Sequence, residues 1–87
     1  MKTPIATLGD IHQCPLHGTT SIVSGDILHK VNGKPIACVG DKTGCGATII
    51  EGVHLSKIGG KAVAYQGAKT SHGGVIISGD STMMVEV

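Results

Sequence analysis

The feature that most constrains this chain is an internal repeat with an offset of 27 residues. Segments 40–52 and 67–79 read GDKTGCGATIIEG and GAKTSHGGVIISG, so a lysine–threonine pair, an isoleucine pair and a closing glycine recur in register. The same offset carries Gly25 onto Gly52. Repetition at a fixed spacing indicates a structure assembled from equivalent units.

A first copy of the unit begins near Gly9. Its HG dipeptide at 17–18 aligns with CG at 45–46 and HG at 72–73, once one extra residue is allowed before Gly25. The first copy also carries a loop about four residues longer than the others. The third copy is truncated after the equivalent of its second strand.

These boundaries predict one small domain. We place the repeats at about residues 9–39, 40–66 and 67–87, with residues 1–8 as an N-terminal segment. Three short copies are too few for an extended solenoid, so we expect them to close around a pseudo-threefold axis. Equivalent residues of the three copies then meet near that axis.

Composition and local pattern predict an all-β fold. Glycine makes up 14 of the 87 residues, Trp and Phe are absent, and β-branched runs at 21–24, 48–51 and 75–78 each precede a glycine. Asn32-Gly33 and Gly59-Gly60 are strong hairpin signals. We therefore expect short strands, tight turns and no helix longer than one turn.

Charge and chain pattern exclude several classes of protein. The formal net charge is +1 without a basic cluster, and Tyr65 is the only residue of the Phe, Trp and Tyr class, so we expect no nucleic-acid binding. No segment resembles a cleaved signal peptide or a membrane span. Synthesis in the cytoplasm, with any export independent of a cleaved signal, is expected. The three cysteines argue against a disulfide framework.

Three potential metal ligands occupy equivalent positions in the repeats. His17, Cys45 and His72 should converge at one end of the axis, whereas a structural zinc ion takes four ligands. The longer first loop supplies His12 and Cys14, and we favour His12 as the fourth ligand with Cys14 as its alternative. Thiolate with imidazole favours zinc, although iron accepts the same ligands.

The predicted site is structural rather than catalytic. Four protein ligands leave no open position for water, and no carboxylate lies beside the cluster as a general base. A metal centre would also stabilise a core that lacks large aromatic residues. His29 and His54 are not equivalent across the repeat and should face solvent, and Cys38 should pack as a small apolar side chain.

The repeated pattern resembles the PAAR-repeat family. It is carried by GDIHQCP at 9–15, VNGKPIACVGDKTGCGATIIEG at 31–52 and IGGKAVAYQGAKTSHGGVIISGDS at 58–81. The eponymous Pro-Ala-Ala-Arg reads Pro-Ile-Ala-Cys at 35–38, and the third GD step is Gly67-Ala68.

The resemblance implies a small conical domain whose pointed end is held by a metal ion. It also implies that the broad base sits on the trimeric, VgrG-like spike protein of a bacterial type VI secretion system, one monomer per trimer. Such a tip would be exported with the spike, touch the target membrane during puncture and adapt effector proteins for delivery. The competing interpretations are a zinc-dependent hydrolase and a zinc-binding adhesive β-module unrelated to secretion.

Overall fold

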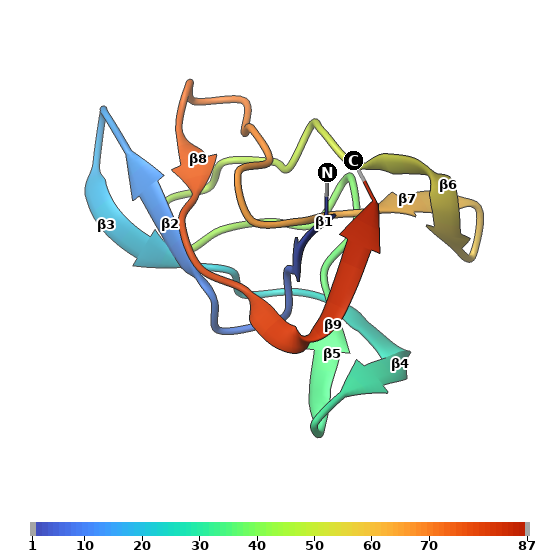
Figure 1. Cartoon of the computed structure of the whole chain (residues 1–87). Helices are drawn as coiled ribbons and strands as arrows, with labels where there is room; N and C mark the ends of the chain where they lie inside the picture. Colours follow the sequence, from blue (N-terminus) through green and yellow to red (C-terminus); the bar gives the residue numbers. More distant parts are fainter. Residues whose placement is uncertain (1, 87) are drawn as a thin grey trace.

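The described part of the chain consists of strands and turns. The computed structural model describes residues 2–86, and for residues 54–56 the backbone alone. The strands are β1 (Lys2–Ile5), β2 (Ile11–Cys14), β3 (Gly18–Ser21), β4 (Asp26–Val31), β5 (Lys34–Ile36), β6 (Val53–Ile58), β7 (Lys61–Val63), β8 (Val75–Ile76) and β9 (Asp80–Glu86) (Figure 1). The prediction of an all-β fold without helix is confirmed for residues 2–86. Over that range, no helix is present that could cross a membrane.

Three two-stranded arms repeat one pairing pattern. β4 pairs with β5, β6 pairs with β7, and β9 pairs with β1, all antiparallel. Each arm has a bulge at the same place, after Asp26, Val53 and Asp80. Figure 1 shows the β4–β5 and β6–β7 hairpins on one side of the molecule and the turns beside β2, β3 and β8 on the other. The arms therefore diverge from the end where those turns lie.

The two hairpin turns form where the sequence predicts them. Asn32 and Gly33 have φ of 51° and 78°, and Gly59 and Gly60 have φ of 59° and 82°. A two-residue hairpin turn of this hand needs positive φ at both central residues, which asparagine and glycine tolerate.

The third arm is built from both ends of the chain. β1 supplies the strand that the truncated third repeat lacks, and Lys2 lies opposite Glu86. The sequence carries a signal for this arrangement, because PIATLGD at 4–10 matches PIACVGD at 35–41. We predicted that residues 1–8 precede the repeats, but residues 2–5 lie in the same folded unit as the third repeat. The domain boundary after residue 8 stays a prediction.

A closed ring of backbone hydrogen bonds marks the pseudo-threefold axis. The N–H of Ala6 donates to Ala64, that of Ala64 donates to Ala37, and that of Ala37 donates back to Ala6, at 3.0, 2.9 and 3.0 Å. All three alanines are fully buried. A larger side chain at any of these positions would have to displace close-packed neighbours, so the small side chain of alanine suits all three.

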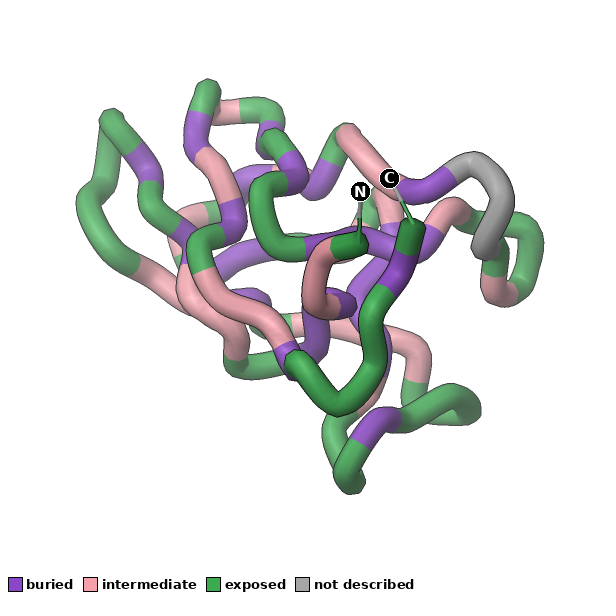
Figure 2. The backbone as a smooth tube through the Cα atoms, in the orientation of Figure 1, coloured by how far each residue is buried: buried purple, intermediate pink, exposed green. Residues whose placement is uncertain are grey.

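The hydrophobic core surrounds the same axis. Ile22, Ile49 and Ile76 occupy equivalent positions and are at most 1% exposed. Figure 2 shows buried residues gathered where the three repeats meet and exposed residues along the outer parts of the arms. The core is aliphatic, with Tyr65 at its edge.

The third repeat departs from the GD pattern but keeps one hydrogen bond of that turn. In two repeats a serine hydroxyl donates to the turn aspartate of the next: Ser78 to Asp10 at 3.0 Å and Ser24 to Asp41 at 3.1 Å. The same hydroxyls accept the backbone N–H of the residue after the aspartate, at 2.9 Å in both turns. In the third turn Ala68 replaces the aspartate and Glu51 replaces the serine, and the Glu51 carboxylate accepts the equivalent backbone N–H of Lys69 at 3.1 Å.

Candidate metal centre

Three side chains from three repeats converge at the end of the axis opposite the arms. Cys14 ends β2, Cys45 lies in the turn between Thr43 and Gly46, and His72 lies in the turn before β8. Their ligand atoms all lie within 4.8 Å of one another. The three residues each stand four positions after the turn residue, at 10, 41 and 68, so they are structural equivalents.

The spacing of this cluster fits a tetrahedral metal ion. Nδ1 of His72 lies 3.7 Å from Sγ of Cys14 and 3.6 Å from Sγ of Cys45. Zinc bonds of about 2.3 Å to sulfur and about 2.0 Å to nitrogen place a sulfur and a nitrogen ligand about 3.5 Å apart in a tetrahedron. The described cluster could therefore hold a metal ion, with a soft donor set typical of zinc.

The thiol of Cys45 is disposed to ionise. The Thr43 hydroxyl, 3.3 Å away, is the main cause that lowers the pKa of Cys45 to about 5. The backbone N–H of Ala47 and the side chains of His72 and Cys14 lower the pKa further, and burial opposes them. A thiolate at neutral pH is the form that binds a metal ion.

His17 lies beside the cluster rather than at a position equivalent to Cys45. Residues 15–17 form the turn of the β2–β3 hairpin, in which Cys14 lies opposite Gly18. The exposed ring of His17 lies 5.2 Å from the ring of His72, centroid to centroid. The extra residues of the first repeat thus extend a hairpin turn that brings His17 next to the ring of His72.

His12 lies beneath the cluster and is fully buried. Its Nε2 lies 2.8 Å from the hydroxyl of Thr70, and its Nδ1 lies 3.2 Å from that of Thr20. Nδ1 is also 3.8 Å from Sγ of Cys45. His12 therefore connects the first repeat to the third and contacts one member of the cluster.

A family model for the PAAR motif matches residues 1–51, more than half of the chain. The chain belongs to the PAAR-motif family. No curated protein matches it. The matched range includes β1, which is consistent with the place of that strand in the third arm.

Cys38 and His29 of this PAAR chain lie apart from the cluster. Cys38 is 2% exposed in the hydrophobic core, and burial raises the pKa of its thiol. His29 is exposed and lies 3.3 Å from Asp26. Both environments agree with the sequence-based expectation. The side chain of His54 lies outside the described residues.

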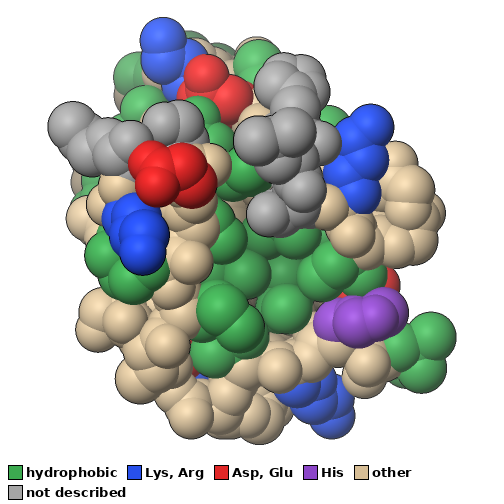
Figure 3. All heavy atoms as spheres, turned by 45° about the vertical axis from the view of Figure 1, so that its right-hand side comes forward, with side chains coloured by type: hydrophobic (Ala, Val, Ile, Leu, Met, Phe, Trp, Pro, Cys, Tyr) green, Lys and Arg blue, Asp and Glu red, His purple; other side chains and the backbone are tan. Residues whose placement is uncertain are grey.

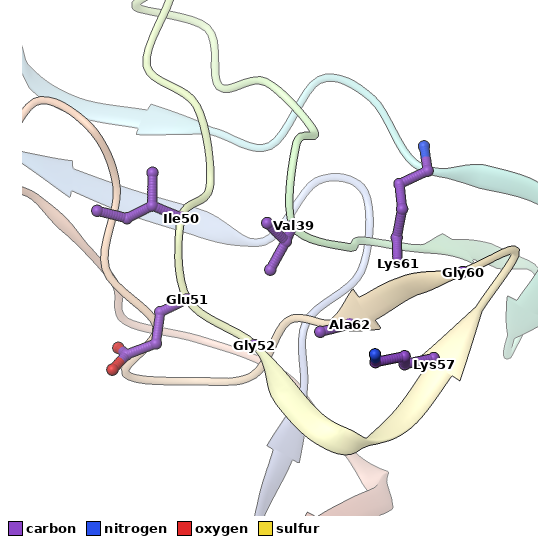
Figure 4. Close-up of a pocket in the computed structure, with 8 residues that line it drawn as sticks. All are labelled: Val39, Ile50, Glu51, Gly52, Lys57, Gly60, Lys61 and Ala62. Carbon is purple, nitrogen blue, oxygen red and sulfur yellow. The ribbon is translucent and has the colours of Figure 1, made fainter.

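The arms of the PAAR domain differ in one groove. Figure 3 shows hydrophobic side chains gathered in a hollow on the face that lies to the right in Figure 1. Beside β6 and β7, a cavity of about 370 Å³ is lined by Val39, Ile50, Glu51, Gly52, Lys57, Gly60, Lys61 and Ala62 (Figure 4). Pro35 and Pro4 stand at the position of Ala62 in the other arms, where they meet Gly25 and Gly79. The replacement of proline by alanine leaves more room in the second arm.

Proposed function

We propose that this chain is the structural tip of a trimeric, VgrG-like spike of a bacterial type VI secretion system. The closed ring of Ala6, Ala37 and Ala64, with its three surrounding arms, carries the proposal together with membership of the PAAR-motif family. A single chain with pseudo-threefold symmetry presents three related surfaces. It can therefore match one surface of each subunit of a threefold partner, one copy per trimer.

Zinc is the proposed metal of the tip. Cys14, Cys45 and His72 would supply three ligands, and His17 is our choice for the fourth because its ring lies 5.2 Å from that of His72, centroid to centroid. The sequence-based set of His12, His17, Cys45 and His72 remains the alternative. When bound, zinc would join loops from three repeats, so that the tip resists unfolding under load. Iron is the less favoured metal.

The arm end is the proposed base. Ile27 and Leu28 of β4 are 72% and 84% exposed, and Met83 and Met84 of β9 are 46% and 43% exposed. Exposed apolar side chains on two neighbouring arms are typical of a surface that a partner covers. We propose that these residues contact the blunt end of the spike.

The role that we propose is mechanical and not enzymatic. Full coordination by protein ligands would leave no site for a substrate or an activated water. The protein would be made in the bacterial cytoplasm and exported with the spike, to contact a target membrane and to carry effectors bound to it.

The deciding experiment is stoichiometric. Purified chain is mixed with a trimeric spike protein, and native mass spectrometry should find one copy per trimer. Leu28→Asp should weaken this binding at least tenfold, whereas Gln13→Ala, an exposed change at the metal end, should not. No binding by the unaltered chain, or equal binding by Leu28→Asp, contradicts the proposal.

Replacement of the bound metal by cobalt distinguishes a structural tip from a hydrolase. Cobalt in a closed site with two thiolates gives an intense tetrahedral spectrum that added anions leave unchanged. A spectrum that shifts with added azide or cyanide would show an exchangeable position and would support the hydrolase interpretation.

A further inference from the structure

Two of the three cluster residues are cysteines from different repeats. Sγ of Cys14, at the end of β2, and Sγ of Cys45, in the turn between Thr43 and Gly46, lie within 4.8 Å of each other. A disulfide needs a sulfur–sulfur distance of about 2.0 Å, so the two sulfurs have to approach each other by less than about 3 Å.

Access to the two thiols is unequal. Cys14 is 1% exposed, whereas Cys45 is half-buried. A small oxidant that arrives from solvent therefore reaches Cys45 first, with Cys14 held behind it. An accessible thiol backed by a second thiol is the arrangement in which oxidation proceeds to a disulfide.

We propose that Cys14 and Cys45 form a metal-or-disulfide pair, which holds a metal ion when reduced and closes to an intramolecular disulfide when a peroxide oxidises it. The metal-bound state in this inference rests on the proposed zinc site, whereas the disulfide state needs only the two thiols. Both states join the first repeat to the second at the same end of the axis. They exclude each other because the same two sulfurs are used.

The oxidation balances with hydrogen peroxide as the oxidant. Sγ of Cys45 attacks one peroxide oxygen, the O–O bond breaks, and a sulfenic acid and water form. Sγ of Cys14 then attacks the sulfenic sulfur, the S–O bond breaks, and a second water leaves as the S–S bond forms. Two thiols lose two protons and two electrons, which reduce one peroxide to two waters. From the metal-bound state the two protons come from solvent and the ion is released.

The test uses the whole zinc-loaded protein treated with hydrogen peroxide. Zinc release is followed with a chromogenic chelator, and intact mass should fall by about 2 Da as one disulfide forms. Trypsin, which does not cut the Lys34–Pro35 bond, places the three cysteines on three peptides, residues 3–30, 31–42 and 43–57. In the expected product a disulfide links peptide 3–30 to peptide 43–57. One zinc ion is released for each disulfide that forms, and a reductant plus zinc restores the zinc-loaded protein.

Two variants test which cysteines form the disulfide. Cys38→Ser should oxidise as the unaltered protein does, whereas Cys14→Ser should stop at an oxidised, unbridged Cys45. Disulfides through Cys38, bridges between chains, zinc retained after oxidation, or zinc lost without the 3–30 to 43–57 bridge each overturn the proposal. If Cys14→Ser does not fold, the peptide map of the unaltered protein decides. Spike binding is assayed separately on reduced protein, so its failure leaves this result independent.

Discussion

Sγ of Cys14 lies 3.7 Å from Nδ1 of His72, although 58 residues separate them in the chain. This contact joins the first repeat to the third, and the 3.6 Å contact of Cys45 with His72 joins the second repeat to the third. An ion bound here would cross-link all three repeats at one end. An unfolded chain has no such preformed site, so metal affinity adds to the free energy of unfolding.

Removal of one thiolate should therefore remove both the metal and the stability it confers. Cys45→Ala should lose zinc and lower the melting temperature by about 10 °C or more, since about 1 kcal/mol shifts a domain of this size by about 4–8 °C. The measurement is calorimetry with and without a chelator, together with metal analysis. The chelator should lower the melting temperature of the unaltered protein and leave that of Cys45→Ala unchanged. His29→Ala, a change at an exposed site, is the control and should shift the melting temperature by less than about 4 °C.

The two candidate fourth ligands should give different phenotypes. His17 is exposed, so His17→Ala should keep the fold and weaken cobalt binding, with a change in the thiolate-to-cobalt band. His12 is fully buried between the hydroxyls of Thr70 and Thr20, so His12→Ala should destabilise the metal-free protein by about 2–4 kcal/mol. Urea unfolding in chelator measures the second effect. An unchanged cobalt spectrum in His17→Ala, with a lost one in His12→Ala, would restore His12 as the ligand.

Gly74 leaves the space that His12 occupies. A Cβ atom at Gly74 would lie 2.6 Å from Nε2 of His12 and would also meet the backbone oxygen of Gln13. Gly74→Ala should cost more than about 2 kcal/mol of stability, because backbone of β2 would have to move. Gly44→Ala, in the turn of the second repeat, is the control, since its Cβ would lie 3.6 Å from the nearest atom, Cβ of Thr20. Equal urea midpoints for the two variants would contradict this packing argument.

The sequence predicts the architecture better than it predicts the ligand set. The 27-residue offset, the glycines and the Asn32-Gly33 turn are local signals, and they led to the all-β fold. The first repeat is ambiguous because its extra residues can be placed on either side of the ligand. Alignment from Gly18 selects His17, whereas alignment from Asp10 selects Cys14. Only the pairing of Cys14 with Gly18 shows that residues 15–17 form the extended turn.

The third arm was missed for a related reason. Its two strands come from opposite ends of the chain, so no hairpin turn connects them and no local sequence signal predicts that they pair. The match between PIATLGD and PIACVGD has an offset of 31 rather than 27, because the first repeat contains the extra turn residues. A search at one fixed offset does not find it.

The stability of the fold should depend on pH through the carboxylate of Asp80. The hydroxyl and backbone N–H of Thr82 and the amide of Asn32 lower the pKa of Asp80 to about 2, with Lys34 as the weakest contributor. A depressed pKa stabilises the fold fully above the usual carboxyl pKa of about 4, and that contribution is lost as pH falls from about 4 to about 2.

The comparison is between the unaltered protein and Asp80→Asn, both in chelator. Urea midpoints at pH 7 should differ clearly in favour of the unaltered protein, and the difference should shrink towards pH 2. Lys34→Ala should change little, because its ion pair with Asp80 is 3.7 Å long and half of the lysine side chain is exposed. A difference independent of pH would show that charge on Asp80 is not its cause.

Proline at position 62 should stabilise the second arm. Pro35 and Pro4 occupy the equivalent positions of the other two arms, so the backbone there accepts a residue without an N–H. Ala62→Pro should raise the free energy of unfolding by about 0.4–1 kcal/mol, because it reduces the conformational freedom of the unfolded chain. Ala64→Pro is the contrasting change two residues later. Its N–H donates to Ala37 in the axial ring, and its loss should cost about 3 kcal/mol or more. Urea unfolding of both variants gives the signs, and a destabilised Ala62→Pro would mean that the three arms are less equivalent than their pairing indicates.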